Sequence, residues 1–208
     1  SYQRQGRIYT YPPNYGQEAI SGAVGALIRE DDWLVPAFRE MGAMLAKGVT
    51  LKELFLYFMG YEDGSNYSMA KKTLPISVPI ASQFLHAAGL GYAIKYNKEK
   101  DLVYAFVGDG GTSEGDFHEE INFAGVWKIL VIFIIQNNQY GISTPTRMQT
   151  ASENLAVKAV AYGVKGIKVD GNDYFAMYKT IQESIRICEE GEGPVLIEAV
   201  TYRKGAHT

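Results

Sequence analysis

Two unbroken apolar runs are the strongest pattern along the chain. They cover 102–107 and 129–135, and both are rich in β-branched and aromatic residues. Such runs, without polar alternation, are typical of central strands in a parallel sheet, because helices cover both faces of those strands. Two shorter runs of the same kind lie at 166–169 and 194–201. The pattern therefore predicts strands at these four places in the second half of the chain.

Helical spacing of apolar residues fills the intervals between these runs. Near the start of the chain, Ile20, Ala23 and Leu27 fall on one side of a helix. The predicted helices cover 17–29, 51–59, 81–96, 115–125, 153–162 and 173–190. Strands that alternate with helices predict an α/β fold, a doubly wound and mostly parallel sheet with helices on both faces. We expect residues 1–208 to form one domain of this kind.

Composition excludes several classes of function. The 208 residues contain 20 Lys and Arg and 23 Asp and Glu, so the net charge is −3. This balance disfavours a protein that binds nucleic acid through a broad basic face. The longest apolar run, 129–135, is far shorter than the roughly 20 residues of a membrane helix, so we expect no membrane partner. Cys188 is the only cysteine and cannot form an internal disulfide, which favours a reducing, cytoplasmic location.

Each of the two long strands is followed by a turn whose residues are suited to binding a metal ion or a phosphate group. A glycine-rich turn, 108–115, follows the first strand, and Gln136–Tyr140 follows the second. One strand-helix-strand unit separates them, so both turns are expected at the carboxyl edge of the sheet, where open α/β sheets bind ligands. The glycine-rich turn matches neither the dinucleotide fingerprint, because Ser113 occupies its sixth position, nor a P-loop.

The residues in these two turns favour a hard cation beside a diphosphate. Asp109 offers a carboxylate and Asn138 an amide oxygen, and such donors suit Mg²⁺ or Ca²⁺. Mg²⁺ takes one or two carboxylates and completes its shell with water and phosphate oxygens. Main-chain N–H groups of a glycine-rich turn at a helix N-terminus would hold the anion. The alternative is that Asn137 and Asn138 only cap the next turn.

Gly-Asp-Gly followed by 26 residues and Asn-Asn resembles the thiamine diphosphate motif. The wider blocks 108–125 and 136–145 resemble the alpha subunits of the first component of 2-oxo acid dehydrogenase complexes, of the pyruvate or branched-chain type. The resemblance extends from Gln5 to Thr208. Members of this family are longer at both ends, so we expect the chain to be truncated at both termini.

The resemblance implies a metal and cofactor role for the matching residues. Asp109, the side chain of Asn138 and the carbonyl of Tyr140 would bind Mg²⁺. Arg39 would bind the diphosphate, and Phe38 stands where the family usually has tyrosine, which removes one hydroxyl contact to phosphate. The other positions expected to bind thiamine diphosphate are Val78, Ile80, Gly108, Gly110, Gly111, Ile142, Arg203 and His207.

Some of these positions also have a simpler interpretation. The backbone at Val78 and Ile80 would hold the aminopyrimidine, and Ile142 would wedge the cofactor into a bent form. Without the resemblance, Ile80 and Ile142 would pass as core residues and Arg39 as a solvated surface residue.

The resemblance also implies three catalytic residues. His207 would assist decarboxylation or acyl transfer, because an imidazole can stabilise developing charge near neutral pH. Asp116 and Glu119 would belong to an acidic path that links paired active sites. Acids in the first turn of a helix are also favoured by the helix dipole, which is the structural alternative for both.

Carbanion formation on this cofactor needs a carboxyl beside the aminopyrimidine, and the sequence places none there. In the resembled family that glutamate comes from a beta subunit. The resemblance therefore implies an assembly of two alpha and two beta chains, a lipoyl-bearing second component and a small 2-oxo acid substrate.

The sequence leaves other thiamine enzymes open. An acetoin dehydrogenase, half of a transketolase-like enzyme and a non-catalytic cofactor-binding module are the alternatives. Thr10, in an entry stretch rich in tyrosine, leaves both pyruvate and branched-chain 2-oxo acids possible.

Overall fold

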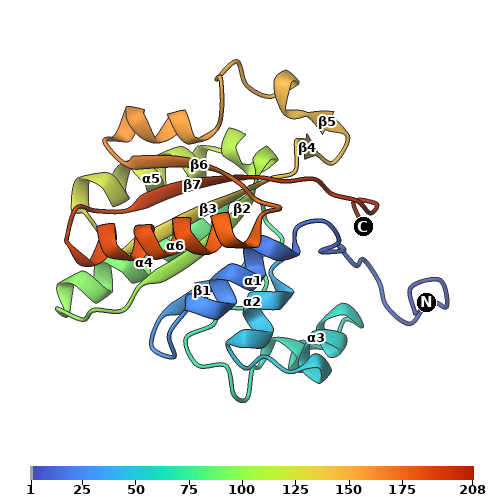
Figure 1. Cartoon of the computed structure of the whole chain (residues 1–208). Coiled ribbons are helices and arrows are strands. Elements are labelled where there is room, and N and C mark those ends of the chain that lie inside the picture. Colours follow the sequence, from blue (N-terminus) through green and yellow to red (C-terminus); the bar gives the residue numbers. More distant parts are fainter. Residues whose placement is uncertain (1) are drawn as a thin grey trace.

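A five-stranded sheet is the centre of the computed structural model, which describes residues 2–208. Every paired strand in this sheet runs parallel to its neighbour (Figure 1). The spatial order is β1 (Trp33–Val35), β2 (Val103–Gly108), β3 (Val131–Asn137), β7 (Val195–Val200) and β6 (Lys165–Asp170). The four strands predicted in the second half of the chain are confirmed, and the three-residue β1 is added to them.

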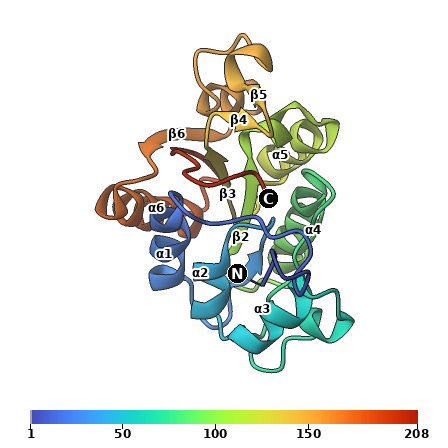
Figure 2. The same ribbon diagram turned by 90° about the vertical axis from the view of Figure 1, so that its right-hand side faces the viewer.

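Helices cover both faces of the sheet, which confirms the predicted α/β fold class (Figures 1 and 2). One face carries α1 (Glu18–Leu27), α2 (Met41–Ala46) and α6 (Tyr174–Glu189). The other carries α4 (Ser82–Tyr96) and α5 (Gly115–Trp127), while α3 (Leu51–Phe58) packs on the short helix η1 (Glu62–Ser65). No helix within residues 2–208 has both the length and the apolar character that crossing a membrane requires.

The side chains of the central strands alternate between two apolar cores. Tyr104 and Phe106 of β2 belong to the core beneath α1 and α6, whereas Val103 and Ala105 belong to the core beneath α4 and α5. In the second core, the Phe84 ring lies 4.7 Å from that of Phe133. Both cores are made of buried apolar side chains, which explains why the strands show no polar alternation in the sequence.

The structure differs from the sequence prediction in short elements. The segment predicted as a helix at 153–162 is a 3₁₀-helix, η4 (Ala156–Tyr162), which ends at Gly163 with a left-handed φ of 64°. A 3₁₀-helix of seven residues is unusually long, since most such runs have about three or four residues. The strand predicted from 129 begins at Val131, because the main-chain N–H of Ile129 still bonds the end of α5. β1 and α2 are too short to show a period.

A buried carboxylate joins the first strand to the rest of the sheet. Asp32 is fully buried just before β1. It accepts hydrogen bonds from the Arg29 guanidinium and main-chain N–H, and from the main-chain N–H of Leu102 at 2.8 Å. This carboxylate therefore fixes where β1 enters beside β2.

We expect Asp32→Ala to destabilise the protein by about 3 kcal/mol, because it leaves buried donors unpaired. The melting temperature should fall by roughly 6–12 °C in thermal unfolding followed by circular dichroism. Arg186→Ala is the control, since Arg186 pairs with Glu183 and Glu190 on the solvated side of α6, and it should move the midpoint by about 1 °C at most. Equal shifts for the two variants would contradict the structural role of Asp32.

Candidate functional site

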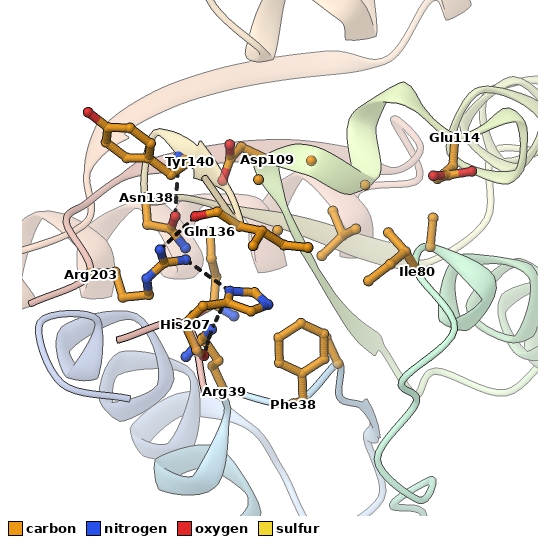
Figure 3. A pocket seen from close by; sticks show the side chains of 18 of the residues that line it. Phe38, Arg39, Ile80, Asp109, Glu114, Gln136, Asn138, Tyr140, Arg203 and His207 are labelled. Carbon is orange, nitrogen blue, oxygen red and sulfur yellow. Dashed lines mark hydrogen bonds between the residues drawn. The ribbon is translucent and has the colours of Figure 1, made fainter. Parts of the chain in front are cut away.

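A cavity of about 400 Å³ opens where β2 and β3 end (Figure 3). The ends of the two strands lie level, since Gly108 pairs with Gln136 in the parallel register. Five segments contribute most of the wall: 37–40, 80–83, 107–114, 136–142 and the tail from 203 to 207. The carboxyl edge of the sheet therefore brings together residues from nearly the whole length of the chain.

Most of the predicted cofactor-binding residues line this cavity. They are Phe38, Arg39, Ile80, Gly108, Asp109, Gly110, Gly111, Asn138, Tyr140, Ile142, Arg203 and His207. Val78 lies outside the lining and is 61% exposed. Asp116 and Glu119 also lie outside it, one turn apart on α5. The two sequence turns that carry Asp109 and Asn138 do meet in space.

Asp109 offers one free carboxylate oxygen to the cavity. The residue is 1% exposed. Its Oδ2 accepts from Thr146 Oγ1 at 3.0 Å and from Gln149 Nε2 at 3.4 Å, whereas no group among the described residues donates to the buried Oδ1. Burial raises the pKa of this carboxyl, with the hydrogen bonds opposing the effect. A bound cation would satisfy Oδ1 and offset the cost of burying the charge.

Asn138 and Tyr140 lie beside Asp109 at one end of the cavity (Figure 3). Asn138 Nδ2 donates to Gln17 Oε1 at 3.2 Å, and its Oδ1 accepts from the main-chain N–H of Tyr140 at 3.3 Å. Residues 2–208 hold no cluster of three or more His, Cys, Asp or Glu side chains that could bind a metal. A site with one carboxylate, an amide and a carbonyl oxygen fits Mg²⁺, which needs few carboxylates.

The glycine-rich turn presents bare backbone to the same cavity. A Cβ added at Gly108 would meet no atom within 4 Å, so it would project into open space. A Cβ at Gly111 would come within 2.3 Å of Val107 Cγ2, so only glycine allows the turn to lie this close to β2. The turn thus leaves room for an anion beside its main-chain N–H groups.

Two arginines enclose His207 in the same cavity (Figure 3). Its Nδ1 lies 3.3 Å from Arg39 Nη2 and 3.1 Å from Arg203 Nη1. A guanidinium can only donate, so Nδ1 accepts and the imidazole is neutral with its proton on Nε2. Burial, followed by the two neighbouring cations, lowers the pKa of His207.

These guanidiniums form no ion pair with any carboxylate of the described chain. Arg39 is only 4% exposed, and burial, followed by the charge of Arg203, lowers its pKa to about 10. The Nε of Arg203 is buried without a partner among residues 2–208. Two guanidiniums that face one cavity and form no ion pair within the described residues favour an anion-binding site.

Ile142 adopts a backbone conformation that is rare for a β-branched residue. Its φ is 58°, in the left-handed region, at the turn between β4 (Tyr140–Gly141) and β5 (Thr144–Pro145). Arg203 Nη2 holds its carbonyl oxygen at 2.9 Å, and the 64% exposed side chain lines the cavity. Strain of this kind is concentrated at functional sites, where the surroundings maintain it.

Sequence reasoning missed several buried polar residues of the cavity. They are Gln17, Glu40, Gln83 and Gln136, each at most 3% exposed. Of the seven buried side-chain N and O atoms without a partner in the described chain, five belong to lining residues. These atoms are Gln17 Nε2, Gln83 Oε1, Asp109 Oδ1, Gln136 Oε1 and Arg203 Nε. Unpaired polar groups are rare in native interiors, so their concentration here indicates a ligand site.

The fold is the one shared by thiamin diphosphate-dependent enzymes. A transketolase from Campylobacter jejuni matches with a TM-score of 0.63 at 18% identity, covering 87% of this chain and 30% of that one. A protein from Mycobacterium smegmatis described as a thiamin diphosphate-dependent enzyme matches with a TM-score of 0.60 at 13% identity, over 94% and 35% of the two chains. These likenesses define the fold class.

The chain belongs to the dehydrogenase E1 component family, which it matches over residues 1–208. It is 44% identical over 207 residues to the pyruvate dehydrogenase E1 component subunit alpha of Mycoplasma genitalium. It is 45% identical over 206 residues to the 3-methyl-2-oxobutanoate dehydrogenase subunit alpha of Mycobacterium tuberculosis. The matches cover 100% and 99% of this chain but only 58% and 56% of those relatives. The family predicted from the two sequence blocks is confirmed.

Glu40 provides a test of the electrostatics of the cavity. Its carboxylate is fully buried and accepts from the Arg39 main-chain N–H at 2.9 Å and from Gln136 Nε2. Burial raises the pKa of Glu40 to about 7 against these hydrogen bonds. The folded state therefore holds this proton more tightly than the unfolded state, so stability falls as pH rises from about 4.5 to about 7.

The wild-type protein should lose roughly 3 kcal/mol of unfolding free energy as the pH rises above 7, because Glu40 then ionises. We expect Glu40→Gln to remove this pH-dependent loss. Relative to the wild-type protein, the variant should gain unfolding free energy between pH 5 and pH 8 in urea titrations. Glu62→Gln, at an exposed position of η1, is the control and should follow the wild-type curve. A constant difference between Glu40→Gln and wild type at both pH values would show that Glu40 does not titrate in this range.

Proposed function

We propose that this chain is the alpha subunit of the first component of a 2-oxo acid dehydrogenase complex. In this proposal the assembled enzyme decarboxylates a small 2-oxo acid and transfers the acyl group to lipoyl groups of a second component. The observation that carries it is one cavity in which Asp109 and Asn138 face the cationic pair Arg39 and Arg203. The names of the relatives, one for pyruvate and one for 3-methyl-2-oxobutanoate, support both as candidate substrates.

Thiamine diphosphate and Mg²⁺ are the ligands that this donor set suits. Asp109, Asn138 and the Tyr140 carbonyl would hold Mg²⁺, and Arg39, Arg203 and the N–H groups of Gly108, Gly110 and Gly111 would hold the diphosphate. The cofactor supplies the carbanion chemistry of 2-oxo acid decarboxylation, while the protein supplies binding and electrostatics. The free Oδ1 of Asp109 and the unpaired charge of the two arginines support this arrangement.

The remaining residues would shape the organic part of the site. Phe38 and Ile80 supply apolar walls, and Ile142, with its left-handed backbone, adds a third apolar side chain to the lining. The backbone near Val78 and Ile80 would hold the aminopyrimidine. His207, neutral with its proton on Nε2, would donate a hydrogen bond towards the reacting atoms.

A beta subunit would complete the site. Three carboxylates line the cavity: Asp109 is assigned to the metal, Glu40 is held by Gln136, and Glu114 is exposed at the rim. We therefore assign the activating glutamate to a partner chain, in an assembly of two alpha and two beta chains. Aromatic residues exposed on α4 and α5, with Tyr92 and Phe123 both packed against Trp127, supply an apolar face for such a partner.

Asp116 and Glu119 lie on the same helix as part of that aromatic face. Burial, followed by the charges of Glu119 and Asp116, raises the pKa of the adjacent Glu120 to about 7. We propose that these acids line a path for protons between paired sites in the assembly. Their position outside the cavity of this chain agrees with a role at a subunit boundary.

Calorimetry tests the cofactor assignment. We expect thiamine diphosphate to bind only with Mg²⁺, to the chain alone or reconstituted with its beta subunit. Asp109→Asn should weaken this binding roughly tenfold or more, because the metal loses its only carboxylate. Asp170→Asn, the same change at an exposed position outside the cavity, should have no effect. Binding that does not depend on the metal would favour a non-catalytic cofactor-binding module instead.

The subunit assignment predicts that the isolated chain does not decarboxylate 2-oxo acids. Activity should appear when the beta subunit is added, and comparing pyruvate with 3-methyl-2-oxobutanoate then identifies the preferred substrate. Reconstitution with His207→Ala is the control, which should bind cofactor within a few fold of wild type but lose acyl transfer. Robust decarboxylation by the pure chain alone would contradict the assignment.

A further inference from the structure

Glu198 is a buried carboxylate that the proposed function does not use. It lies on β7 between the apolar residues Ile197 and Ala199 and is 1% exposed. No Lys, Arg or His of the described chain forms an ion pair with it. Burying an unpaired carboxylate is costly, so an apolar residue would serve a plain strand better. The reason for a glutamate here must lie in what it binds.

One carboxylate oxygen of Glu198 holds the turn that follows β3. Asn137 Nδ2 donates to Glu198 Oε1 at 2.7 Å. The other side-chain atom, Asn137 Oδ1, accepts from the main-chain N–H of Gln139 at 3.0 Å, and the Asn137 carbonyl accepts from Thr201 N–H at 2.8 Å. With every polar group of its side chain engaged, Asn137 fixes the turn that carries Asn138 and Tyr140.

The second oxygen of Glu198 holds a different part of the chain. Its Oε2 accepts from the main-chain N–H of Leu155 at 2.8 Å and of Ala156 at 3.0 Å, where η4 begins. The segment between Tyr140 and Leu155 contains Thr146 and Gln149, the two donors to Asp109 Oδ2. The Glu198 carboxylate therefore holds the chain at both ends of the segment 138–155, and the middle of this segment donates hydrogen bonds to Asp109.

We propose that Glu198 is a positioning residue for the divalent-cation site. It contacts neither Asp109 nor Asn138, but it sets their relative placement by fixing the ends of 138–155. This inference rests on the proposed function, because it assumes that Asp109 and Asn138 bind the cation. Replacing residues that orient metal ligands through hydrogen bonds typically changes metal affinity by about 10–100-fold.

Glu198→Gln removes one arm of this arrangement. The variant keeps the size of the side chain, and its single oxygen retains more hydrogen bonds by accepting from the N–H groups of Leu155 and Ala156. Its NH₂ group then faces Asn137 Nδ2, so the hydrogen bond to the turn is lost. We expect Mn²⁺ to bind the full chain with thiamine diphosphate about tenfold more weakly, measured by electron paramagnetic resonance. Glu183→Gln, an exposed change on α6, is the control and should leave Mn²⁺ affinity unchanged.

Limited proteolysis without ligands tests whether Glu198 holds the segment 138–155 in place, and it does so independently of metal binding. Arg147 is exposed within 140–155, and trypsin cleavage there is identified by mass spectrometry of the fragment that begins at Met148. Losing one hydrogen bond should speed this cleavage by about fivefold in Glu198→Gln. If wild-type protein bound no Mn²⁺, the proposed function would fail, whereas the proteolysis result would still report on Glu198.

Asn137→Ala provides a second route if Glu198→Gln does not fold. It removes the hydrogen bond to Glu198 and the one that Asn137 Oδ1 accepts from the main-chain N–H of Gln139, so Mn²⁺ affinity should fall and cleavage at Arg147 should speed up at least as much as in Glu198→Gln. Where both variants fold, the double variant should bind Mn²⁺ no more weakly than the weaker single one, because both changes remove the same contact. Unchanged Mn²⁺ affinity in variants whose melting temperature falls would reduce Glu198 to a structural residue and overturn the proposal.

Discussion

The parallel pairing of β2 with β3 is the interaction on which the site depends. The two strands pair from Val103 with Val131 to Gly108 with Gln136, so their following turns start at the same level. Both strands are buried on both faces, and a slip of one residue would exchange the side chains of the two cores. The packing that holds the register therefore also fixes the distance between the turn of Asp109 and the turn of Asn138.

The cavity brings together several features that are unfavourable without a ligand. Asp109 has a free buried oxygen, Arg39 is buried without a carboxylate partner in the described chain, and Ile142 holds a left-handed backbone. Each feature costs stability. The oxygen of Asp109 and the charge of Arg39 become favourable beside a cation and an anion of the right size. The two apolar cores supply the stability that allows these local costs.

The sequence predicted the parts of the site that follow long strands. The runs at 102–107 and 129–135 are unambiguous, and topology alone then brings Asp109 near Asn138. Glu40 and Gln83 were not predicted as site residues, because a single polar residue produces no periodic pattern in the sequence. Their burial results from tertiary packing between α2, α4 and the sheet. The same holds for η4, whose start depends on Glu198, more than forty positions away along the chain.

The place of β7 in the sheet has a consequence for folding during synthesis. β7 is the last strand along the chain, yet it lies in the interior of the sheet between β3 and β6. Until the ribosome has released it, β3 and β6 present open edges with unpaired main-chain groups, and Arg203 and His207 emerge later still. The sheet therefore cannot be completed before β7 has been synthesised, and the edges of β3 and β6 remain exposed in the nascent chain until then.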